Sequence, residues 1–293
     1  MPDQRLQRSI NPSDVDHLSD EEILERYMNA PKIDGERYVR HLTPKTIAKP
    51  SHYTDDEIDE AVEANALNLL FAKSTIPVPR VRRVVKTSEC FLIVMDYIPG
   101  RSLAEVWPTL STWQKIGMAW TLRHYIRQLR HLEAPSTTPP GPISVNGPRI
   151  CQSPLFGQVR PTRGPFASYA DLSHFFNKCH KKASDRENIP LDDPLRADKF
   201  DDSEALVLTH HDLNLRNMIL GEDGRLWIID WGWSGYYPRW FEYIAMWQQN
   251  QREEVSGTND EFWKRLIPFV AGPYFRHKVW YDWMAPSLYF KDY

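Results

Sequence analysis

Three polar residues in the second half of the chain, Asp212, Asn217 and Asp230, have the types and the spacing that suit phosphoryl chemistry. Carboxylate and amide oxygens are hard ligands, and nucleotide-bound Mg²⁺ takes one or two of them from protein and the rest from phosphates and water. A carboxylate can also accept the proton of a hydroxyl that attacks a phosphoryl group. The set therefore indicates metal-assisted transfer of a phosphoryl group to a hydroxyl.

The elements around these residues are expected to bring them together. The apolar run 205–208 predicts a strand that ends shortly before Asp212. Two further apolar runs, 218–220 and 226–229, flank a glycine-containing turn and predict a β-hairpin. Asp230 follows this hairpin, so one loop and one hairpin carry all three side chains.

The order His210, Asp212, Asn217, and then an aspartate after a hairpin is the layout of the protein-kinase-like catalytic core. The wider wording of the chain resembles the aminoglycoside-phosphotransferase-like family, in the form common in fungi. The resemblance implies ATP- and Mg²⁺-dependent phosphorylation of a hydroxyl on a small molecule. It covers roughly residues 40–245 and is carried, in order, by the segments 76–79, 93–100, 164–166, 209–214 and 229–231.

The resemblance also assigns a role to each polar residue. Asp212 is the expected catalytic residue, which orients and deprotonates the hydroxyl, and Asn217 and Asp230 are the expected Mg²⁺ ligands. The adenine is expected to meet the backbone carbonyl of Asp96 and the N–H of Ile98, in the hinge between two lobes. From composition alone, a plain turn between domains would explain the hinge segment equally well.

The predicted elements give an α+β, two-lobed protein-kinase-like fold, with a small sheet-plus-helix N-lobe and a larger, mostly helical C-lobe. A capping box at Thr54 and Glu57 opens a predicted helix that ends near Lys73. The break at Pro99-Gly100 divides the chain into a nucleotide-binding lobe at 1–98, with residues 1–30 as an accessory arm, and a catalytic and substrate lobe at 99–293. The N-lobe strands are expected at 37–42, 46–49, 81–85 and 90–97.

Lys49 is the predicted lysine that contacts the nucleotide phosphates, because it stands at the end of a strand that faces the cleft. Lys45 is a rival for this role. On the helical wheel, Glu63 falls at the edge of the buried arc, where a carboxylate needs a partner. We therefore expect Glu63 to pair with Lys49 and hold it toward ATP. Glu60 lies farther round the wheel and is expected to be solvated.

The strands at 37–42 and 46–49 form the expected phosphate-covering hairpin, with Pro44-Lys45 as its tight connection. Protein kinases use a glycine-rich loop at this place. Here Gly35 is the only nearby glycine. The departure weakens the protein-kinase interpretation more than the kinase interpretation as a whole.

The C-lobe is predicted to be largely helical. A helix from Ser111 to about residue 133 carries a regular apolar stripe, which we interpret as core, and a second helix spans 168–180. Between them, residues 135–165 form a long proline- and glycine-rich loop, and residues 181–204 are charged and expected to be flexible. Glu242 is expected to brace the catalytic loop, the segment 210–217, through an ion pair. The stripe comprises Trp113, Ile116, Trp120, Ile126, Leu129 and Leu132.

Composition excludes several other classes. The formal net charge is −3, so nucleic acid and anionic membranes are poor candidates for a partner. The 3 cysteines are widely spaced and fit a reducing compartment rather than a disulfide framework or a zinc site. The N-terminus lacks a signal-peptide core, and no apolar run is long enough to span a membrane. We expect a cytoplasmic protein.

Two alternatives stay open at this point. A nucleotide-binding pseudokinase scaffold is suggested by the glycine-poor hairpin, although the intact set of Asp212, Asn217 and Asp230 argues against it. A protein kinase is disfavoured because no Ala-Pro-Glu motif and no evident activation loop follow Asp230. Among small molecules, aminoglycosides, choline-like amino alcohols, sugars and fungal secondary metabolites all remain candidates, and the oligomeric state cannot be read from the residues.

Overall fold

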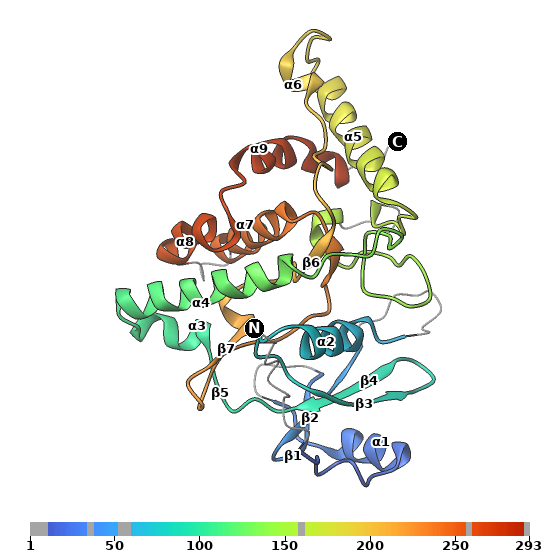
Figure 1. The fold of residues 1–293 in the computed structure, drawn as a ribbon, viewed down its shortest axis with the longest axis vertical. Coiled ribbons are helices and arrows are strands. Elements are labelled where there is room, and N and C mark those ends of the chain that lie inside the picture. Colours follow the sequence, from blue (N-terminus) through green and yellow to red (C-terminus); the bar gives the residue numbers. More distant parts are fainter. Residues whose placement is uncertain (1–10, 34–37, 52–59, 158–161, 256–259, 290–293) are drawn as a thin grey trace, which may run out of the picture.

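The computed structural model describes residues 11–33, 38–51, 60–157, 162–255 and 260–289. A small antiparallel sheet lobe lies against a larger helical lobe, as Figure 1 shows. The predicted α+β, two-lobed protein-kinase-like fold class is therefore confirmed. The exact division of the chain at residues 98 and 99 stays a prediction. None of the helices described is long and apolar enough to cross a lipid bilayer.

The N-lobe sheet has four antiparallel strands in the order β1-β2-β4-β3. Lys49 on β2 lies opposite Ile93 on β4, and Thr46 lies opposite Asp96, so β2 runs away from the hinge toward Lys49. The strands are β1 (Arg40–Thr43), β2 (Thr46–Pro50), β3 (Val81–Lys86) and β4 (Phe91–Asp96).

The central strand β4 is apolar because both of its faces are covered. Leu92 and Val94 pack in a cluster with Ile23 of α1 (Asp20–Asn29). Ile93 and Met95 point to the opposite face, toward α2 (Val62–Lys73) and the main core. Figure 1 shows the sheet between these two helices. Successive side chains of a strand point to opposite faces, so a strand that is buried on both faces requires a continuous apolar run.

The two lobes are joined through a second small sheet. Strand β5 (Gly100–Ser102) pairs with β7 (Met218–Gly221), which forms the predicted hairpin with β8 (Leu226–Ile228). Strand β6 (Val207–Thr209), which leads into the catalytic loop, pairs with β9 (Gly235–Tyr237). The chain segment that carries the polar residues is thus held by strands on both sides.

Helices fill the rest of the C-lobe. Ser111 and Gln114 form the predicted capping box of α4. The α-helices are α3 (Leu103–Val106), α4 (Thr112–Arg130), α5 (Tyr169–Arg186), α6 (Pro194–Ala197), α7 (Trp240–Val255), α8 (Glu261–Ala271) and α9 (Phe275–Met284). The short 3-10 helices are η1 (Trp107–Thr109), η2 (Pro154–Phe156), η4 (Leu215–Asn217) and η5 (Ala285–Leu288).

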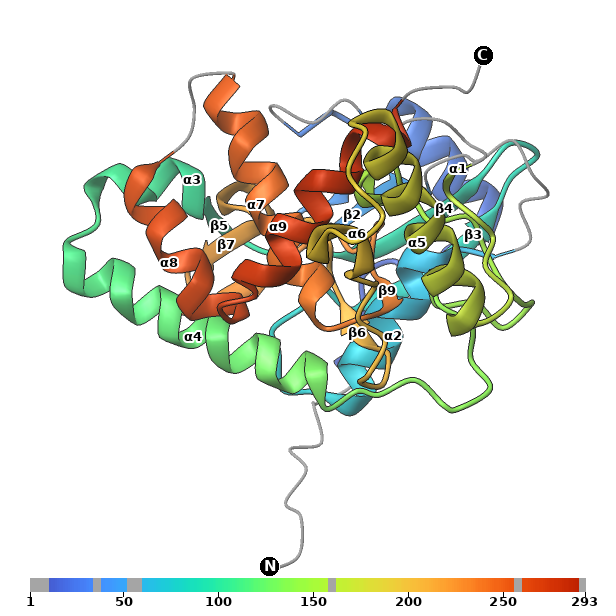
Figure 2. The same cartoon turned by 90° about the horizontal axis from the view of Figure 1, so that it is seen from above.

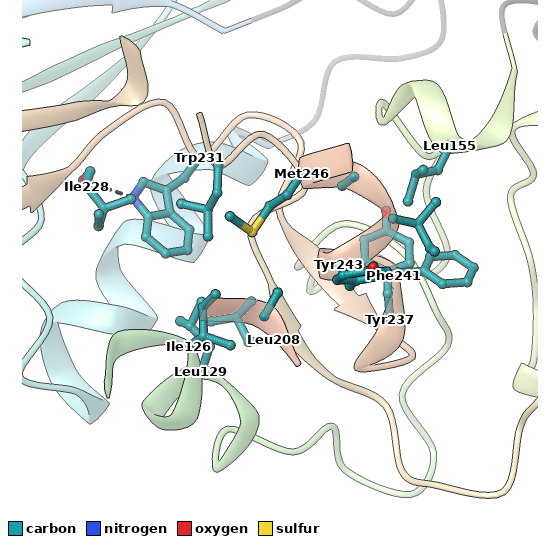
Figure 3. Close-up of a cluster of buried hydrophobic side chains, with 14 of the residues drawn as sticks. Ile126, Leu129, Leu155, Leu208, Ile228, Trp231, Tyr237, Phe241, Tyr243 and Met246 are labelled. Atoms are coloured by element: carbon teal, nitrogen blue, oxygen red, sulfur yellow. Dashed lines mark hydrogen bonds between the residues drawn. The ribbon is translucent and has the colours of Figure 1, made fainter. Parts of the chain in front are cut away.

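The core beneath the catalytic loop is a cluster of large apolar side chains (Figure 3). Trp231, which directly follows Asp230, is 1% exposed, and its indole N–H donates to the Ile228 carbonyl at 3.2 Å. Leu208 of β6 and Met246 of α7 pack in the same cluster. The catalytic loop therefore packs against a closely packed apolar core, which limits its freedom to move.

Two predictions for the C-lobe helices were wrong in part. Trp113 and Trp120 are 81% and 57% exposed, because the face of α4 that meets the core has a different phase. The second predicted helix does not end at residue 180 but continues to Arg186. Its last turns bury further residues, and Lys181 pairs with Asp185 along the helix. The buried residues of α4 are Ala119, Leu122, Ile126 and Leu129.

The packing of β4 against α1 predicts a stability difference between two neighbouring strands. Leu92→Ala should lower the free energy of unfolding by about 2–5 kcal/mol, since Leu92 is 1% exposed and a cavity would remain. Val84→Ala on β3 is the control, because Val84 is 37% exposed and should cost less than about 0.5 kcal/mol. Urea unfolding measures both. Equal losses would contradict the described burial of β4.

Candidate active site

The catalytic loop after β6 is held by hydrogen bonds to its backbone. The Glu242 carboxylate on α7 accepts from the N–H of His210 at 2.5 Å and of His211 at 3.2 Å. Its expected bracing role therefore rests chiefly on backbone donors, with Arg130 as a nearby positive charge. Burial raises the pKa of Glu242 to about 7, against the effect of these hydrogen bonds. A carboxylate inside the core thus fixes the start of the loop.

His210 links the two chain segments of the site. One ring nitrogen, Nδ1, accepts from the N–H of Asp212 at 3.1 Å, and the other, Nε2, lies 3.0 Å from the carbonyl of Ile229. Burial lowers the pKa of His210 to about 4, so the ring is neutral at physiological pH. A neutral ring with its proton on Nε2 satisfies both contacts. His210 is thus a structural bridge between Asp212 and the segment that leads to Asp230.

The carboxylate of Asp212 is oriented by two amide side chains. Asn217 donates to Oδ2 at 2.8 Å and Asn214 donates to Oδ1 at 3.1 Å. Burial, together with the negative charge of Asp230, raises the pKa of Asp212 to about 7. A carboxylate with this pKa is a stronger base than an ordinary aspartate and still ionises near neutral pH.

Lys49 stands between two carboxylates from different parts of the chain. Its Nζ lies 2.9 Å from Glu63 Oε2 and 2.6 Å from Asp230 Oδ1. Burial alone would lower the pKa of Lys49, but the two carboxylates outweigh it and raise the pKa above its ordinary value. The predicted Lys49–Glu63 pair is present, and the contact with Asp230 joins β2 and α2 to the end of the β7–β8 hairpin.

Asp230 owes its position to a local backbone turn. Its φ angle is 61°, in the left-handed region that aspartate tolerates better than most residues. Just after it, the N–H of Trp231 donates to Glu63 Oε1 at 3.2 Å. Glu63 therefore holds both Lys49 and the backbone beside Asp230.

All seven residues predicted for the site line one cleft of about 640 Å³. At the hinge end, the N–H of Tyr97 donates to the Lys45 carbonyl at 2.8 Å, whereas no described residue accepts from the N–H of Ile98. The Asp96 carboxylate is held by Arg82 at 2.5 Å, which leaves the backbone of Asp96 as the part relevant to a ligand. The seven residues are Lys49, Glu63, Asp96, Ile98, Asp212, Asn217 and Asp230.

The residues at the inner end of the cleft fit a magnesium ion. The amide nitrogen of Asn217 is engaged by Asp212, so its Oδ1 is the atom that can ligate. Asp230 adds a carboxylate that lines the same cleft. No group of three or more His, Cys, Asp or Glu among the described residues could hold a metal by itself. An asparagine and one aspartate leave the remaining positions to phosphates and water, which is the usual arrangement for nucleotide-bound Mg²⁺.

The prediction for the phosphate-covering hairpin was wrong. The Pro44-Lys45 turn lies at the hinge end, because Thr46 is opposite Asp96 and Tyr97 bonds to Lys45. This geometry also places the backbone of the rival lysine, Lys45, beside the hinge. Strand direction relative to the hinge cannot be read from local sequence, which explains the error.

A different pair of antiparallel segments, 31–33 and 39–41, borders the cleft. The N–H of Ile33 donates to the Val39 carbonyl at 3.1 Å, and the N–H of His41 donates to the Pro31 carbonyl at 3.2 Å. Ile33 and Val39 line the cleft. Residues 34–37 lie outside the described residues, as do Thr54 and Glu57 of the predicted capping box.

Sequence reasoning also missed three contacts. Glu60, expected to be solvated, has a side chain that is only 9% exposed and lies in a cluster of hydrogen bonds. Asn214 orients Asp212, a role that its position two residues later could have suggested. Arg216 lines the cleft and pairs with Glu253 of α7 at 3.0 Å. The Glu60 and Glu253 contacts join distant segments and leave no local signal.

Taken together, the two-lobed fold and the cleft between β2, α2 and the catalytic loop define a protein-kinase-like phosphotransferase. A family model described as "Phosphotransferase enzyme family" matches residues 34–274. The chain belongs to this phosphotransferase family and is an enzyme of the class that phosphorylates small-molecule hydroxyls. A comparison with curated protein sequences gave no match.

Solved structures with this fold include three antibiotic phosphotransferases. A spectinomycin phosphotransferase in complex with ADP and spectinomycin has a TM-score of 0.50 and 16% identity, over 88% of this chain and 79% of that one. A Streptomyces rimosus aminoglycoside phosphotransferase in complex with ADP and streptomycin has a TM-score of 0.47 and 15% identity, over 84% of this chain and 88% of that one. A thermostable mutant of another aminoglycoside phosphotransferase, in complex with AMP-PNP and hygromycin B, has a TM-score of 0.47 and 11% identity, over 92% of this chain and 97% of that one. At such identities the likeness concerns the fold alone.

The Lys49 contacts predict a large stability effect. Lys49→Met should lower the free energy of unfolding by about 3–5 kcal/mol, because it leaves the buried carboxylate of Glu63 without its cation. Adding Glu63→Gln should recover part of the loss, since the charge is removed and an acceptor for the Trp231 N–H is kept. Chemical unfolding at neutral pH measures each variant.

Lys45→Met is the matched control, because Lys45 lies at the exposed turn of the same hairpin. It should leave stability within about 0.5 kcal/mol of the parent protein. A Lys49→Met variant as stable as Lys45→Met would show that the ion pairs contribute nothing net.

Proposed function

We propose that this enzyme uses ATP and Mg²⁺ to phosphorylate a hydroxyl group of a small molecule. The observation that supports the proposal best is the meeting of Lys49, Asp212, Asn217 and Asp230 on one cleft. A base, a phosphate-binding cation and two hard oxygen ligands are the parts that phosphoryl transfer requires from a protein. Their separation along the chain makes a chance arrangement a poor explanation.

The nucleotide is proposed to lie along the cleft from the hinge to Lys49. The Asp96 carbonyl and the N–H of Ile98, which has no acceptor among the described residues, would meet the adenine edge. Met95 and Ile219 supply apolar cleft walls. Lys49, held by Glu63, would then contact the phosphates. A fold neighbour, the spectinomycin phosphotransferase, was solved with ADP, which supports a nucleotide as the ligand of this fold.

Asn217 Oδ1 and the Asp230 carboxylate would hold the magnesium ion. When bound, Mg²⁺ offsets the negative charge of the phosphates as the phosphoryl group moves. Asp230 now contacts Lys49, so its carboxylate is already on the side of the cleft where the phosphates would lie. Lys49 can transfer its contact to phosphate oxygens while Glu63 continues to hold it.

Asp212 is the proposed base. Its carboxylate is fixed by Asn214 and Asn217, so one orientation is set before the acceptor arrives. Its raised pKa suits acceptance of a proton from an alcohol near neutral pH. The contribution of the residues is thus mainly positioning and electrostatics, with little covalent chemistry.

For the acceptor we propose a polyhydroxylated or amino-alcohol compound, of the aminoglycoside or choline-like kind. The spectinomycin complex of the fold neighbour makes such compounds the first to test. We place the reaction in the cytoplasm, where ATP is abundant. Cys90, Cys151 and Cys179 form no disulfide bond among the described residues, which agrees with a reducing compartment.

The direct test is ADP release from ATP and Mg²⁺ with a panel of aminoglycosides, choline-like amino alcohols and sugars. Asp212→Asn should lower turnover with any active acceptor by about 10²–10⁴-fold, because the proton acceptor is lost. ATP affinity, measured by calorimetry, should change little, since Lys49 and the hinge are intact.

Asp223→Asn is the control, because Asp223 is a carboxylate in the turn of the β7–β8 hairpin, where Arg225 and Trp227 donate to it. It should leave turnover unchanged. Unchanged turnover in Asp212→Asn would exclude the base role. Nucleotide binding without ADP release from ATP in the presence of any acceptor would favour a pseudokinase scaffold.

The raised pKa of Asp212 predicts the pH dependence of kcat/KM. Below about pH 7 the carboxylate becomes protonated and cannot accept a proton, so kcat/KM should fall about tenfold per pH unit toward acid. The measurement is kcat/KM for ATP with Mg²⁺ between pH 5 and 9, which reports on the enzyme before the nucleotide and the metal bind. A profile that stays flat down to pH 5 would contradict the described environment of Asp212.

A further inference from the structure

A second carboxylate of the α2 segment, Glu60, is bound by the long loop of the other lobe. Its Oε2 accepts from the N–H of Val145 at 3.1 Å, and its Oε1 accepts from Arg149 at 3.1 Å and from the hydroxyl of Ser144. On its own side, Asn65 of α2 donates to Oε2 at 2.8 Å. The same asparagine donates to the carbonyl of Ile143 at 3.1 Å. We call the contacts of Glu60 and Asn65 with residues 143–149 the loop clasp.

The electrostatics of Glu60 agree with a tightly held anion. Burial would raise the pKa of this carboxyl, but the hydrogen bonds from Ser144, Val145 and Asn65 outweigh it and lower the pKa below its ordinary value. The carboxylate is therefore charged at neutral pH and fully supplied with donors. Release of the clasp would leave several of these donors unsatisfied.

The other end of the loop is anchored beside the catalytic segment. Gly141 and Tyr236 exchange backbone hydrogen bonds, at 3.1 Å and 2.9 Å. Tyr236 belongs to β9, which follows Asp230 closely in the chain. Figure 2 shows the green segment after α4 running beside α2. The loop thus connects the segment after Asp230 to the start of α2.

The start of α2 packs in the main core through Ala61 and Ala64, but no side chain caps its first turn. Its N-cap position, Ala61, makes no side-chain cap. The helix nevertheless has to place Glu63 within 2.9 Å of Lys49 and 3.2 Å of the Trp231 N–H. Only the N-cap Ala61 and the first helical residue Val62 separate Glu60 from Glu63, so a displacement of one moves the other. The loop clasp supplies the constraint that a capping residue would otherwise give.

We propose that Glu60 is a positioning residue for phosphoryl transfer: the loop clasp holds α2 where Glu63 can orient Lys49 toward the nucleotide phosphates. This inference rests on the proposed function for the role of Lys49. Glu60 itself acts only through Glu63, because it is not among the residues that line the cleft. The long loop therefore supports the nucleotide site from outside.

A double-mutant cycle tests this dependence, with ADP and Mg²⁺ binding measured by calorimetry. Glu60→Ala should weaken binding about tenfold in the parent protein and less than about twofold when Glu63→Ala is already present. The effect should vanish because Glu63 is the residue through which Glu60 acts. Ser144→Ala, which removes one donor and keeps Glu60, should give a smaller loss in the same direction. Equal losses in both backgrounds would overturn the proposal.

Asp185→Ala is the matched control, since Asp185 is also a carboxylate bound by cations, Lys181 and Arg196, but lies on α5. It should leave ADP binding unchanged. Thermal melts of each variant measure whether it is folded at the temperature of the titration.

Hydrogen–deuterium exchange separates this inference from the proposed function. Glu60→Ala should speed amide exchange across α2 (Val62–Lys73) and leave the β7–β8 hairpin unchanged, with no nucleotide present. Unchanged exchange in α2 would overturn the loop clasp even if the enzyme is active. Faster exchange in α2 together with a parent protein that binds no nucleotide would keep the clasp and reject the proposed function.

Discussion

The site depends on one ionic contact, in which the ammonium of Lys49 lies between the carboxylates of Glu63 and Asp230. These three side chains come from β2, α2 and the segment after β8, so the contact joins both lobes. Removing Lys49 would leave two carboxylates without their cation in a cleft that is partly shielded from water, where such charges are costly. Electrostatics therefore set the distance between the lobes at the place where a nucleotide would enter.

The rest of the fold keeps the two halves of this contact in place. The Leu92 and Val94 face of β4 fixes the sheet against α1, while Ile93 and Met95 fix it against the side that carries α2. On the opposite side, Trp231 anchors the turn at Asp230 in the core. The apolar packing specifies where the backbones lie, and the buried polar groups then specify how the side chains are oriented. Neither layer alone would produce the site.

The fold class and five of the seven residues around the cleft could be predicted because their signals are local, whereas Asp96 and Ile98 were assigned from the family resemblance alone. The β7–β8 hairpin has a glycine-containing turn between two apolar runs, and Asp230 follows it directly. Glu63 could be paired with Lys49 because helical periodicity places it at the edge of a buried face. These arguments need only neighbouring residues and the geometry of a single element. The resemblance to a known family supplied their roles.

What the sequence did not reveal has a common physical cause. The hinge-side position of the Pro44-Lys45 turn depends on which end of β2 meets Asp96, and this is a property of the assembled sheet. The burial of Glu60 depends on a loop more than 80 residues away along the chain. Pairings between distant segments carry no periodicity. Only the folded structure shows that Glu60, which lies on the polar part of the helical wheel, accepts hydrogen bonds from Ser144 and Val145.

The charges of the cleft are arranged so that each catalytic group is restrained before any ligand binds. Asp212 and Asp230 repel one another, which contributes to the raised pKa of Asp212, and Lys49 offsets only one of the two. A bound cation at Asn217 and Asp230 would reduce this repulsion and release Lys49 toward phosphate oxygens. Glu63 would keep the lysine in the cleft during that exchange. The same ion pair that joins the lobes in the absence of ligand would thus provide the cation for the proposed phosphoryl transfer, because Lys49 has two carboxylate partners and needs only one of them to stay in place.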